Sequence, residues 1–477
     1  NRGADNPAGL IISERLRAEI SGLNQAVSNS ERASSVIATA EGSLAEVGDL
    51  LNSIKALVVE ASNTGALSDA ERTANQLQID SAIESITRIS NSTSFGGLKL
   101  LNGELDYVLS GLVSADISKA QVHGANFAGQ ANVRVDVDVV ASAQTANLYM
   151  RGDYPAAPAM NGRLLSSLTL EIAGSNGVQV LQFLSGQLLS DVAAAINSFT
   201  EGTGVKAALI NPANAASGLV FSSASFGSDA FVSVKRLSDS GDFFQTFELA
   251  NNASVPATFS FSDAALVAQL TPSNDDHGRD VSAVVNGTLG TGKGLSIALH
   301  NSTSLSIELL LDQDFATANN STSTFYITGG GALYQLGGEI NASQQINIGI
   351  ASIAASRLGG TLIGDELHFL SSLKSGGAND LNSRNFASAS DILQAATDEV
   401  AIIRGRLGAF ERNTLQTNVR SLQTAVENLT ASESTIRDAD FAKETTALTR
   451  AQILTTTATS VLGLANQQSQ QVLQLLG

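Results

Sequence analysis

The sequence predicts a multi-domain α+β protein in which both chain ends form a long antiparallel, coiled-coil-like helical bundle around β-rich inserted outer domains. Near both ends, apolar residues recur in steps of three and four, which is the spacing of one face of a helix. From about residue 108 to residue 350 apolar and polar residues alternate instead, and every proline except Pro7 falls there. A chain of 477 residues is also long enough for several domains.

The C-terminal stripe predicts one long helix. Its apolar residues are Ile392, Ala396, Val400, Ile403, Leu407 and Phe410 and, after a one-residue skip, Leu415, Val419, Leu422, Val426 and Leu429. Ser390 is the expected N-cap, and Asp391 lies where the helix dipole favours a negative charge. No proline follows Pro272, so we expect about 40 residues of unbroken helix, roughly 60 Å long.

A matching stripe near the N-terminus predicts the partner helix, about 50 residues long. It consists of Leu16, Ile20, Leu23, Val27, Ile37, Leu44, Val47, Leu51, Ile54 and Val58. Its middle is small rather than apolar, with Ser28, Ser30, Ser34 and Ser35. Such side chains either let a neighbouring helix come close or form a solvated face, and the sequence does not decide between them.

Asn63, Thr64 and Gly65 are expected to end this helix, and the run Ser68 to Glu71 has the pattern of a capping box for the next. This second helix, with Leu77, Ile79, Ile83 and Ile86, is expected to stop at residues 91–94. A short loop makes the two helices antiparallel neighbours. The glycine pair in residues 95–103 then predicts a hairpin.

The middle of the chain predicts strands, with one short helix capped by Ser190 and Asp191. Strands are expected around residues 133–137, 168–172, 178–181, 205–210, 219–222 and 230–234, and further ones between 257 and 327. Three glycines at 329–331 and a strand at 346–350 lead back to the helices, whereas residues 363–373 are ambiguous. The expected division is 1–107 (helical arm and hairpin), 108–328 (insertion), 329–389 (return hairpin and connector), 390–435 (long helix) and 436–477 (final helix).

Composition narrows the function classes. A net charge of −18 argues against nucleic-acid binding, and the absence of cysteine rules out disulfides and thiolate metal sites. No apolar run is long enough to span a membrane, and no signal peptide is visible. Because the chain starts at Asn1 without an initiating Met, we expect that an upstream segment is missing.

No catalytic, cofactor or metal site is predicted. Asp275, Asp276 and His277 lie in a polar loop where a solvated turn is the better interpretation than a metal site. Asp365-Glu366-Leu367-His368 has the wrong spacing for a metalloprotease, and Asp438 and Asp440 are expected to cap a helix. Arg151-Gly152-Asp153 is best explained as a chance tripeptide. Asn91, Asn301 and Asn320 match the glycosylation acceptor pattern.

Five segments resemble bacterial flagellins in order and spacing. They are residues 1–11, 95–103 (FGGLKLLNG), 407–413 (LGAFERN), 436–444 (IRDADFAKE) running on to 450–454 (RAQIL), and 465–477. Residues 165–237, with Ala194 to Asn197 and Gly227 to Phe231, resemble a repeat found in flagellin insertions. Residues 329–350 resemble the family's return hairpin into the helical domain.

The resemblance implies an extracellular filament subunit that is exported unfolded through the flagellar type III apparatus, with a C-terminal tail that binds an export chaperone before it lines the filament core. Filament cap and junction proteins are further implied partners. We expect the core-helix and chaperone residues to be Arg450, Ile453, Leu454, Val461, Val472 and Leu475. We expect arm and subunit packing to use Leu16, Ile20, Leu23, Val27, Leu44, Leu51, Ile54, Leu407, Phe410, Leu415, Leu422 and Leu429.

One departure concerns a host innate immune receptor that recognises many flagellins. Lys55 and Leu57 fit the family's recognition face, but Ser53 and Gln78 stand where the family has its key arginine and glutamate. We therefore expect weak recognition. Two other functions stay open at this stage: a hook–filament junction protein, and an adhesin or glycan-binding role for the insertion.

Overall fold

The computed structural model describes residues 7–127, 129–151, 162–215, 217–237, 245–249, 261, 267–301, 305–364, 366–437 and 441–476. The chain forms two compact units. The terminal unit consists of Asn1–Ser34, Gln335–Gln345 and Glu411–Gly477, and the central unit consists of Ser35–Tyr334 and Ile346–Phe410. Each unit contains parts of the chain that are distant in sequence, because both chain ends contribute helices.

The predicted N-terminal helix is confirmed as α1 (Pro7–Ser62), which is 56 residues long and ends where the Asn63–Gly65 turn was expected. In the central unit its apolar stripe is fully buried: Leu44, Val47, Leu51 and Ile54 are all 0% exposed. The first turns of the helix, in the terminal unit, carry Leu10, Ile11 and Ile12, which are exposed.

The capping box at the start of α2 (Asp69–Ser92) is also confirmed. The Ser68 hydroxyl accepts from the Glu71 amide at 3.3 Å, and a Glu71 carboxylate oxygen accepts from the Ser68 amide at 2.8 Å. Ile79, Ile83 and Ile86 are buried, whereas Leu77 was wrongly assigned to the apolar face and is 63% exposed. The predicted hairpin follows as β1 (Ser94–Phe95) and β2 (Leu98–Lys99), joined through Gly96 and Gly97, both with positive φ.

The C-terminal long helix begins four residues earlier than predicted, as α7 (Phe386–Phe410). Ser390 is therefore not the N-cap, and Asp391 lies inside the helix, where burial raises the pKa of its carboxyl. The earlier start places Ala389 in the core, 1% exposed, and its amide donates to the Asn385 carbonyl. This burial outweighs the preference of serine for the cap position.

The predicted helix is not a single α-helix. After Phe410 it passes through a π-helical turn, η4 (Glu411–Leu415), into α8 (Gln416–Arg437). A π-turn accommodates one extra residue per turn, and the apolar stripe skips one residue at this point. Leu415, the first apolar residue after the skip, is therefore buried at 1% exposure. The last helix, α9 (Phe441–Leu476), is 36 residues long.

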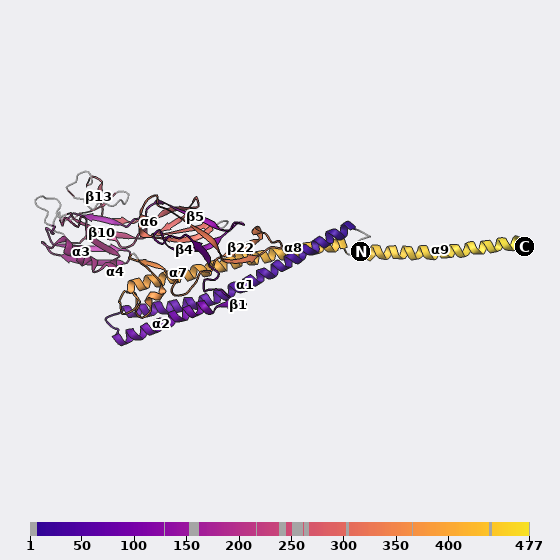
Figure 1. Ribbon diagram of the computed structural model, residues 1–477, viewed down its shortest axis with the longest axis horizontal. Helices are drawn as coiled ribbons and strands as arrows, with labels where there is room; N and C mark the ends of the chain where they lie inside the picture. The colour runs from indigo at the N-terminus through magenta and orange to yellow at the C-terminus, as the bar shows by residue number, and fades with distance from the viewer. Residues whose placement is uncertain are drawn as a thin grey trace. The chain divides into compact units, whose positions relative to one another are not determined.

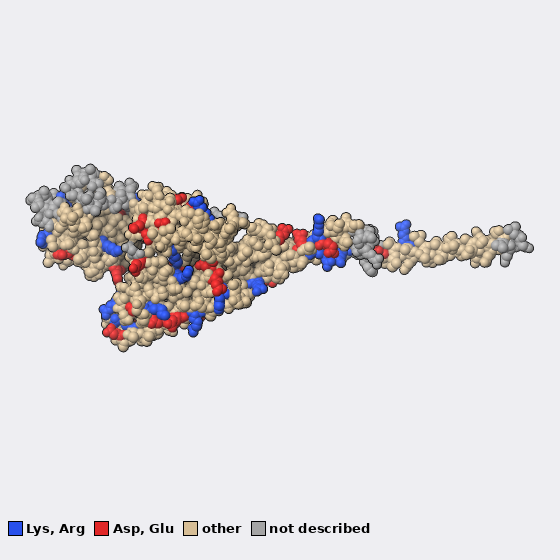
Figure 2. Space-filling view, viewed as in Figure 1, with Lys and Arg blue, Asp and Glu red and all other residues tan. Residues whose placement is uncertain are grey.

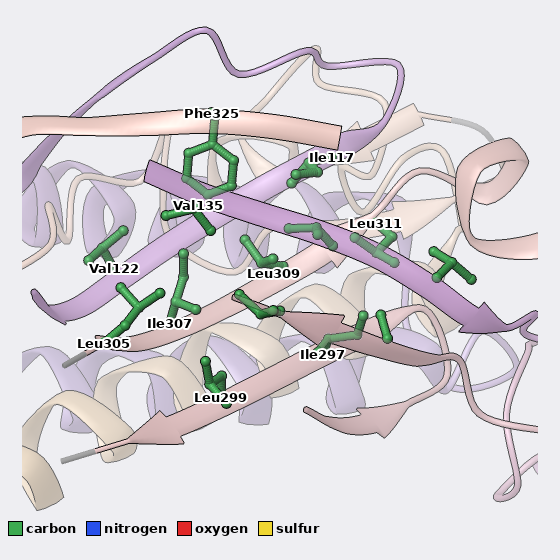
Figure 3. Close-up of a cluster of buried hydrophobic side chains, with 14 of the residues drawn as sticks. Ile117, Val122, Val135, Ile297, Leu299, Leu305, Ile307, Leu309, Leu311 and Phe325 are labelled. Atoms are coloured by element: carbon green, nitrogen blue, oxygen red, sulfur yellow. The ribbon is translucent and has the colours of Figure 1, made fainter. Parts of the chain in front are cut away.

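The insertion contains one β-sandwich whose two sheets have the strand orders β16-β15-β5-β20-β3 and β17-β18-β19-β4 in the described part of the chain. Every second residue of β19, from Leu305 to Leu311, is buried, and the residues between them are half-buried. This is the period of two expected of a half-buried strand. Figure 3 shows Ile307, Leu309 and Phe325 among the buried side chains that fill the sandwich. The strands are β3 (Tyr107–Ser110), β4 (Ile117–Ala125), β5 (Val133–Ala141), β15 (Ser282–Val285), β16 (Thr288–Leu289), β17 (Thr291–Lys293), β18 (Ser296–Asn301), β19 (Leu305–Leu311) and β20 (Thr322–Gly330), with the short helix α6 (Gln313–Thr317).

A second β-rich part has its own core, which includes Leu170, Ile196 and Phe221. Its sheets have the orders β13-β12-β6-β10-β9 and β14-β11-β7-β8. The strands are β6 (Asn147–Met150), β7 (Leu168–Gly174), β8 (Gly177–Phe183), β9 (Val205–Leu209), β10 (Leu219–Ser223), β11 (Phe231–Arg236), β12 (Thr246–Leu249), β13 (Leu270–Pro272) and β14 (Asp275–His277), with the helices α3 (Leu189–Asn197) and α4 (Thr200–Thr203). Helix α3 starts before the expected cap at Ser190, because Leu189 is buried and Leu188 occupies the N-cap position without a side-chain bond.

The return to the helices uses two hairpins. The expected one forms from β21 (Ala332–Gln335) and β22 (Gln345–Ile348). The ambiguous region forms β23 (Thr361–Ile363) and β24 (Glu366–His368), followed by the 3-10 helix η3 (Leu370–Leu373). Figure 1 follows this path from the magenta and pink insertion to the orange helix α7.

Candidate functional site

The most exposed apolar element is α9. Leu448, Ile453, Leu454, Val461, Leu462, Leu464 and Val472 are between 57% and 63% exposed. Charged residues occur only in its first turns, the last of them being Arg450, which is also exposed, so the helix is almost uniformly tan in Figure 2. Leu475 lies in the helix, but its side chain is outside the described residues. An apolar helix with no buried face gains little stability in water, so α9 has the properties of a segment that needs a partner.

A second candidate surface lies in the terminal unit, where the predicted stripes are only half-buried. Leu16, Ile20, Leu23 and Val27 of α1 and Leu422 and Leu429 of α8 are all of intermediate exposure. In α8 no residue is fully buried. These two helices therefore keep part of their apolar surface in water in the single chain.

The small residues of α1 let α8 come close, which answers one question that the sequence left open. Ser30 is 0% exposed and accepts from the Asn418 side-chain amide at 3.2 Å, and Ser34 donates to Glu411 at 2.6 Å. Ser28 and Ser35 are exposed. A groove of about 300 Å³ remains beside this contact, lined by Ser30, Glu31, Ser34, Leu415, Gln416, Val419 and Arg420.

The return hairpin contacts the same helices. A Cβ on Gly22 would lie 3.1 Å from the Gly338 carbonyl oxygen, so glycine at position 22 allows the loop to approach α1 closely. The Asn418 side-chain amide also donates to the Leu336 carbonyl at 2.7 Å. The loop is thereby held by both α1 and α8 in the terminal unit.

Other predicted packing residues face the interior of the central unit. Leu44, Leu51 and Ile54 are 0% exposed and Leu407 is 3% exposed. Phe410 is half-buried, with its ring centroid 6.0 Å from that of Tyr334. These five side chains hold the chain itself together, whereas the half-buried residues of the terminal unit have surface available for another copy.

The residues predicted for receptor recognition differ in their exposure and contacts. Lys55 donates to the Gln394 side chain at 2.9 Å, Leu57 is half-buried, and Gln78 is exposed. Their role in recognition stays a prediction.

A buried polar cluster that was not predicted from the sequence lies at the contact of α7 with the sandwich. The Arg406 guanidinium donates to the His123 carbonyl at 2.6 Å and lies 2.7 Å from His123 Nδ1, while His123 Nε2 lies 3.7 Å from Glu308. Nearby, Lys119 pairs with Glu399 at 3.0 Å. A cavity of about 390 Å³ adjoins these groups. His123 and Arg406 are 283 residues apart in the sequence, so no local motif could have revealed their contact.

Burial decides the electrostatics of this cluster. It lowers the pKa of His123, and it lowers the pKa of Arg406 to about 10, so at neutral pH the imidazole is neutral and the guanidinium charged. A neutral His123 can accept a hydrogen bond from the Arg406 guanidinium at Nδ1. Its Nε2–H group then faces Glu308. The nearby His123 side chain is the main reason that the pKa of Glu308 is lowered.

The remaining motifs carry no visible chemistry. Asp276 accepts from the Asn147 amide at 2.6 Å, and burial raises the pKa of its carboxyl. Within the described ranges, no group of three or more His, Asp or Glu residues could hold a metal ion, and no helix there is long and apolar enough to cross a membrane. Asp153, Asp365, Asp438 and Asp440 lie outside the described residues.

Comparison with known proteins finds three family models in this chain. Residues 1–106 match the bacterial flagellin N-terminal helical region, residues 390–476 the bacterial flagellin C-terminal helical region, and residues 169–225 the flagellin hook IN motif. The first two matches include α1, α2, α7, α8 and α9, and the third lies in the second β-rich part.

Curated relatives match along the whole length. Flagellin B of Vibrio cholerae is 25% identical over all of this chain and 90% of its own length. Flagellin of Salmonella rubislaw is 27% identical over all of this chain and 92% of its own. Among solved structures, FliC from Burkholderia pseudomallei is 16% identical over 81% of this chain and 99% of its own, at a TM-score of 0.25, which is too low to support an argument about fold.

Proposed function

The chain belongs to the bacterial flagellin family, and from this membership we propose that the exposed apolar faces of α9 and of the terminal unit join one copy to the next. The protein is a structural subunit of the flagellar filament, an extracellular appendage for swimming. We propose that it has no enzymatic activity.

The observation that supports this role for α9 is its exposed apolar surface. A helix whose apolar residues are about 60% exposed gains its stability from partners that the single chain does not supply. At roughly 25 cal/mol per Å² of apolar surface, an interface of a few thousand Å² stabilises a polymer strongly. Contacts between unlike faces of identical copies generate a helical fibre when the rotation from one copy to the next does not close into a ring.

The half-buried stripes of α1 and α8 fit the same role. Leu16, Ile20 and Leu23 on one helix and Leu422 and Leu429 on the other keep part of their apolar surface accessible. We propose that subunit stacking completes their burial, whereas Leu44, Leu51, Ile54, Leu407 and Phe410 serve the fold of each copy.

We further propose that α9 is the segment an export chaperone binds, because an exposed apolar helix must be shielded before assembly. Passage through the flagellar type III export apparatus as an unfolded chain fits a sequence without cysteine, since no disulfide can form. Filament cap and junction proteins are the partners at the ends of the polymer. Recognition of the face around Lys55, Leu57 and Gln78 by a host innate receptor is proposed to be weak.

The test compares two double variants of α9 in the cell that makes the filament. Leu454→Glu with Val461→Glu places charges on apolar positions, whereas Gln452→Glu with Thr459→Glu places the same charges on polar positions of the same helix. We expect electron micrographs to show no filaments with the first pair and normal filaments with the second. Secretion of the first variant as a soluble protein would place the defect in assembly. Normal filaments with both pairs would contradict the proposed role of α9.

A further inference from the structure

Strand β8 (Gly177–Phe183) lies at one edge of the sheet β14-β11-β7-β8. Its only strand neighbour in the described part of the chain is β7, with which it forms a hairpin through Ser175 and Asn176. Helix α4 contacts the hairpin at its turn end: the Asn176 amide donates to the Thr203 carbonyl at 3.3 Å, and a Cβ on Gly174 or Gly177 would meet the carbonyl oxygen of Thr203 or Gly202. Among the described residues, no strand pairs with the other side of β8.

The register of the hairpin shows which backbone groups are available. Gly174 is opposite Gly177 and closes a two-residue turn, so Gly177, Gln179, Leu181 and Phe183 exchange hydrogen bonds with β7. By the alternation of an antiparallel ladder, the N–H and C=O groups of Val178, Val180 and Gln182 point outward. The Val180 carbonyl accepts only a long bond, 3.3 Å, from the exposed Gln179 side chain. Three alternate residues of the edge strand thus direct their backbone N–H and C=O groups outward.

The side chains of this edge lack the usual protection against pairing. Val178 is 61% exposed, Val180 is 48% exposed, and Leu184 just beyond the strand is 61% exposed. β8 contains no proline and no charged residue, although the chain as a whole carries a net charge of −18. Natural edge strands are commonly protected by Lys, Pro or a bulge. Because the chain is acidic, two copies repel each other electrostatically. This repulsion is smallest where neither copy presents a charged side chain.

We propose that β8 is a self-association edge, at which two copies of this chain pair antiparallel with Val180 of one copy opposite Val180 of the other. Val178 then lies opposite Gln182 of the second copy, so each copy uses the same three outward residues. Such a pairing is isologous and self-complementary, and it joins two four-stranded sheets into one. It goes beyond the proposed function, because β8 belongs to the central unit and shares no residue with α8 or α9.

The first test uses the absence of cysteine, which makes a single introduced thiol unique. In a hydrogen-bonded antiparallel pair the Cα atoms are about 5.5 Å apart, within the range of a disulfide. We expect Val180→Cys to form a disulfide-linked dimer under mild oxidation. Val140→Cys is the matched control: this valine is 57% exposed but lies in β5, which has a strand on each side. It should stay monomeric on a non-reducing gel.

A mixing experiment tests the register. Two copies of Val178→Cys would place their thiols four strand positions apart, about 13 Å, which is too far to cross-link. A mixture of Val178→Cys with Gln182→Cys should instead give the mixed dimer. Equal cross-linking of Val180→Cys and Val140→Cys, or no dimer from either the Val180 variant or the mixture, would overturn the proposed pairing.

A third measurement separates this edge from filament assembly. Val180→Lys should reduce self-association of the 477-residue chain in sedimentation equilibrium, whereas Val140→Lys should leave it unchanged. Both variants should still build filaments, because α9 and the terminal unit are intact. Normal filaments from the Leu454→Glu, Val461→Glu variant, with β8 cross-linking intact, would contradict only the role of α9. Unchanged self-association after Val180→Lys would refute the role of β8.

Discussion

Helices α7 and α9 carry similar apolar patterns in opposite environments. In α7, Ile392, Leu393 and Ala396 are 0% exposed, whereas Leu454 and Val461 of α9 are about 60% exposed. Periodicity alone marks both as helices with an apolar face. The difference shows that the pattern specifies a need for burial, and the rest of the molecule decides whether that need is met within one copy or between copies.

The strongest test of this comparison truncates one leucine in each helix. Leu393→Ala should lower the free energy of unfolding by about 2–5 kcal/mol, since it leaves a cavity in a closed core. Leu454→Ala should change the unfolding of the single chain by roughly 0.5 kcal/mol or less, as is usual for exposed positions. Urea titration followed by circular dichroism measures both. An equal loss in the two variants would mean that α9 is already packed in the monomer.

Helix α8 should fall between these limits. Leu429→Ala removes a half-buried side chain and should cost about 1 kcal/mol in the same titration. The matched control is Gln423→Ala, which removes an exposed polar side chain from the same helix and should have little effect. If α8 behaved like α7, the terminal unit would have a complete core in the single chain, and subunit contacts would have less apolar surface to bury.

The smallest expected effect is a change in how the free energy of unfolding depends on pH. His123, which is 6% exposed, has its pKa lowered by burial, so the unfolded chain binds more protons than the folded chain as the pH falls through about 6.5. Stability from the contact of α7 with His123 is therefore present above that pH and lost below it. Its neighbours Arg406 on α7, Glu308 on β19 and His300 on β18 act on the same group.

Unfolding titrations between pH 5 and pH 8 measure this response. We expect His123→Asn to reduce the fall in stability on acidification. A Leu454→Ala background should show the same pH slope as the parent, because α9 carries no ionisable group after Arg450. A steeper slope in His123→Asn would contradict a neutral buried imidazole.

Much of the helical architecture could be predicted because its signals are local. The stripe of α1, the Asn63–Gly65 stop and the Ser68–Glu71 capping box depend on neighbours a few residues away. The predicted cap at Ser390 was wrong for the same reason: burial of Ala389, a tertiary effect, extends α7 beyond the best local cap. The one-residue skip before Leu415 was visible in the sequence, but its structural form was not. In the structure it is a π-turn, which keeps the apolar stripe on one face of the helix.

The candidate site shows the same limit. The apolar positions of α9 were expected from the resemblance to flagellins, whereas the division of the packing residues into internal ones (Leu44, Leu51) and half-buried ones (Leu23, Leu429) required the structure. The cluster of His123, Glu308 and Arg406 could not be found, since only folding brings these residues together.

The lack of charge along most of α9 has a consequence for where the filament can work. Dissolved salt weakens attraction between charges and leaves apolar burial largely intact. The contacts proposed for the helix after Arg450 should therefore hold with similar strength in fresh water and in the sea. A bacterium that moves from one to the other should keep these filament contacts unchanged.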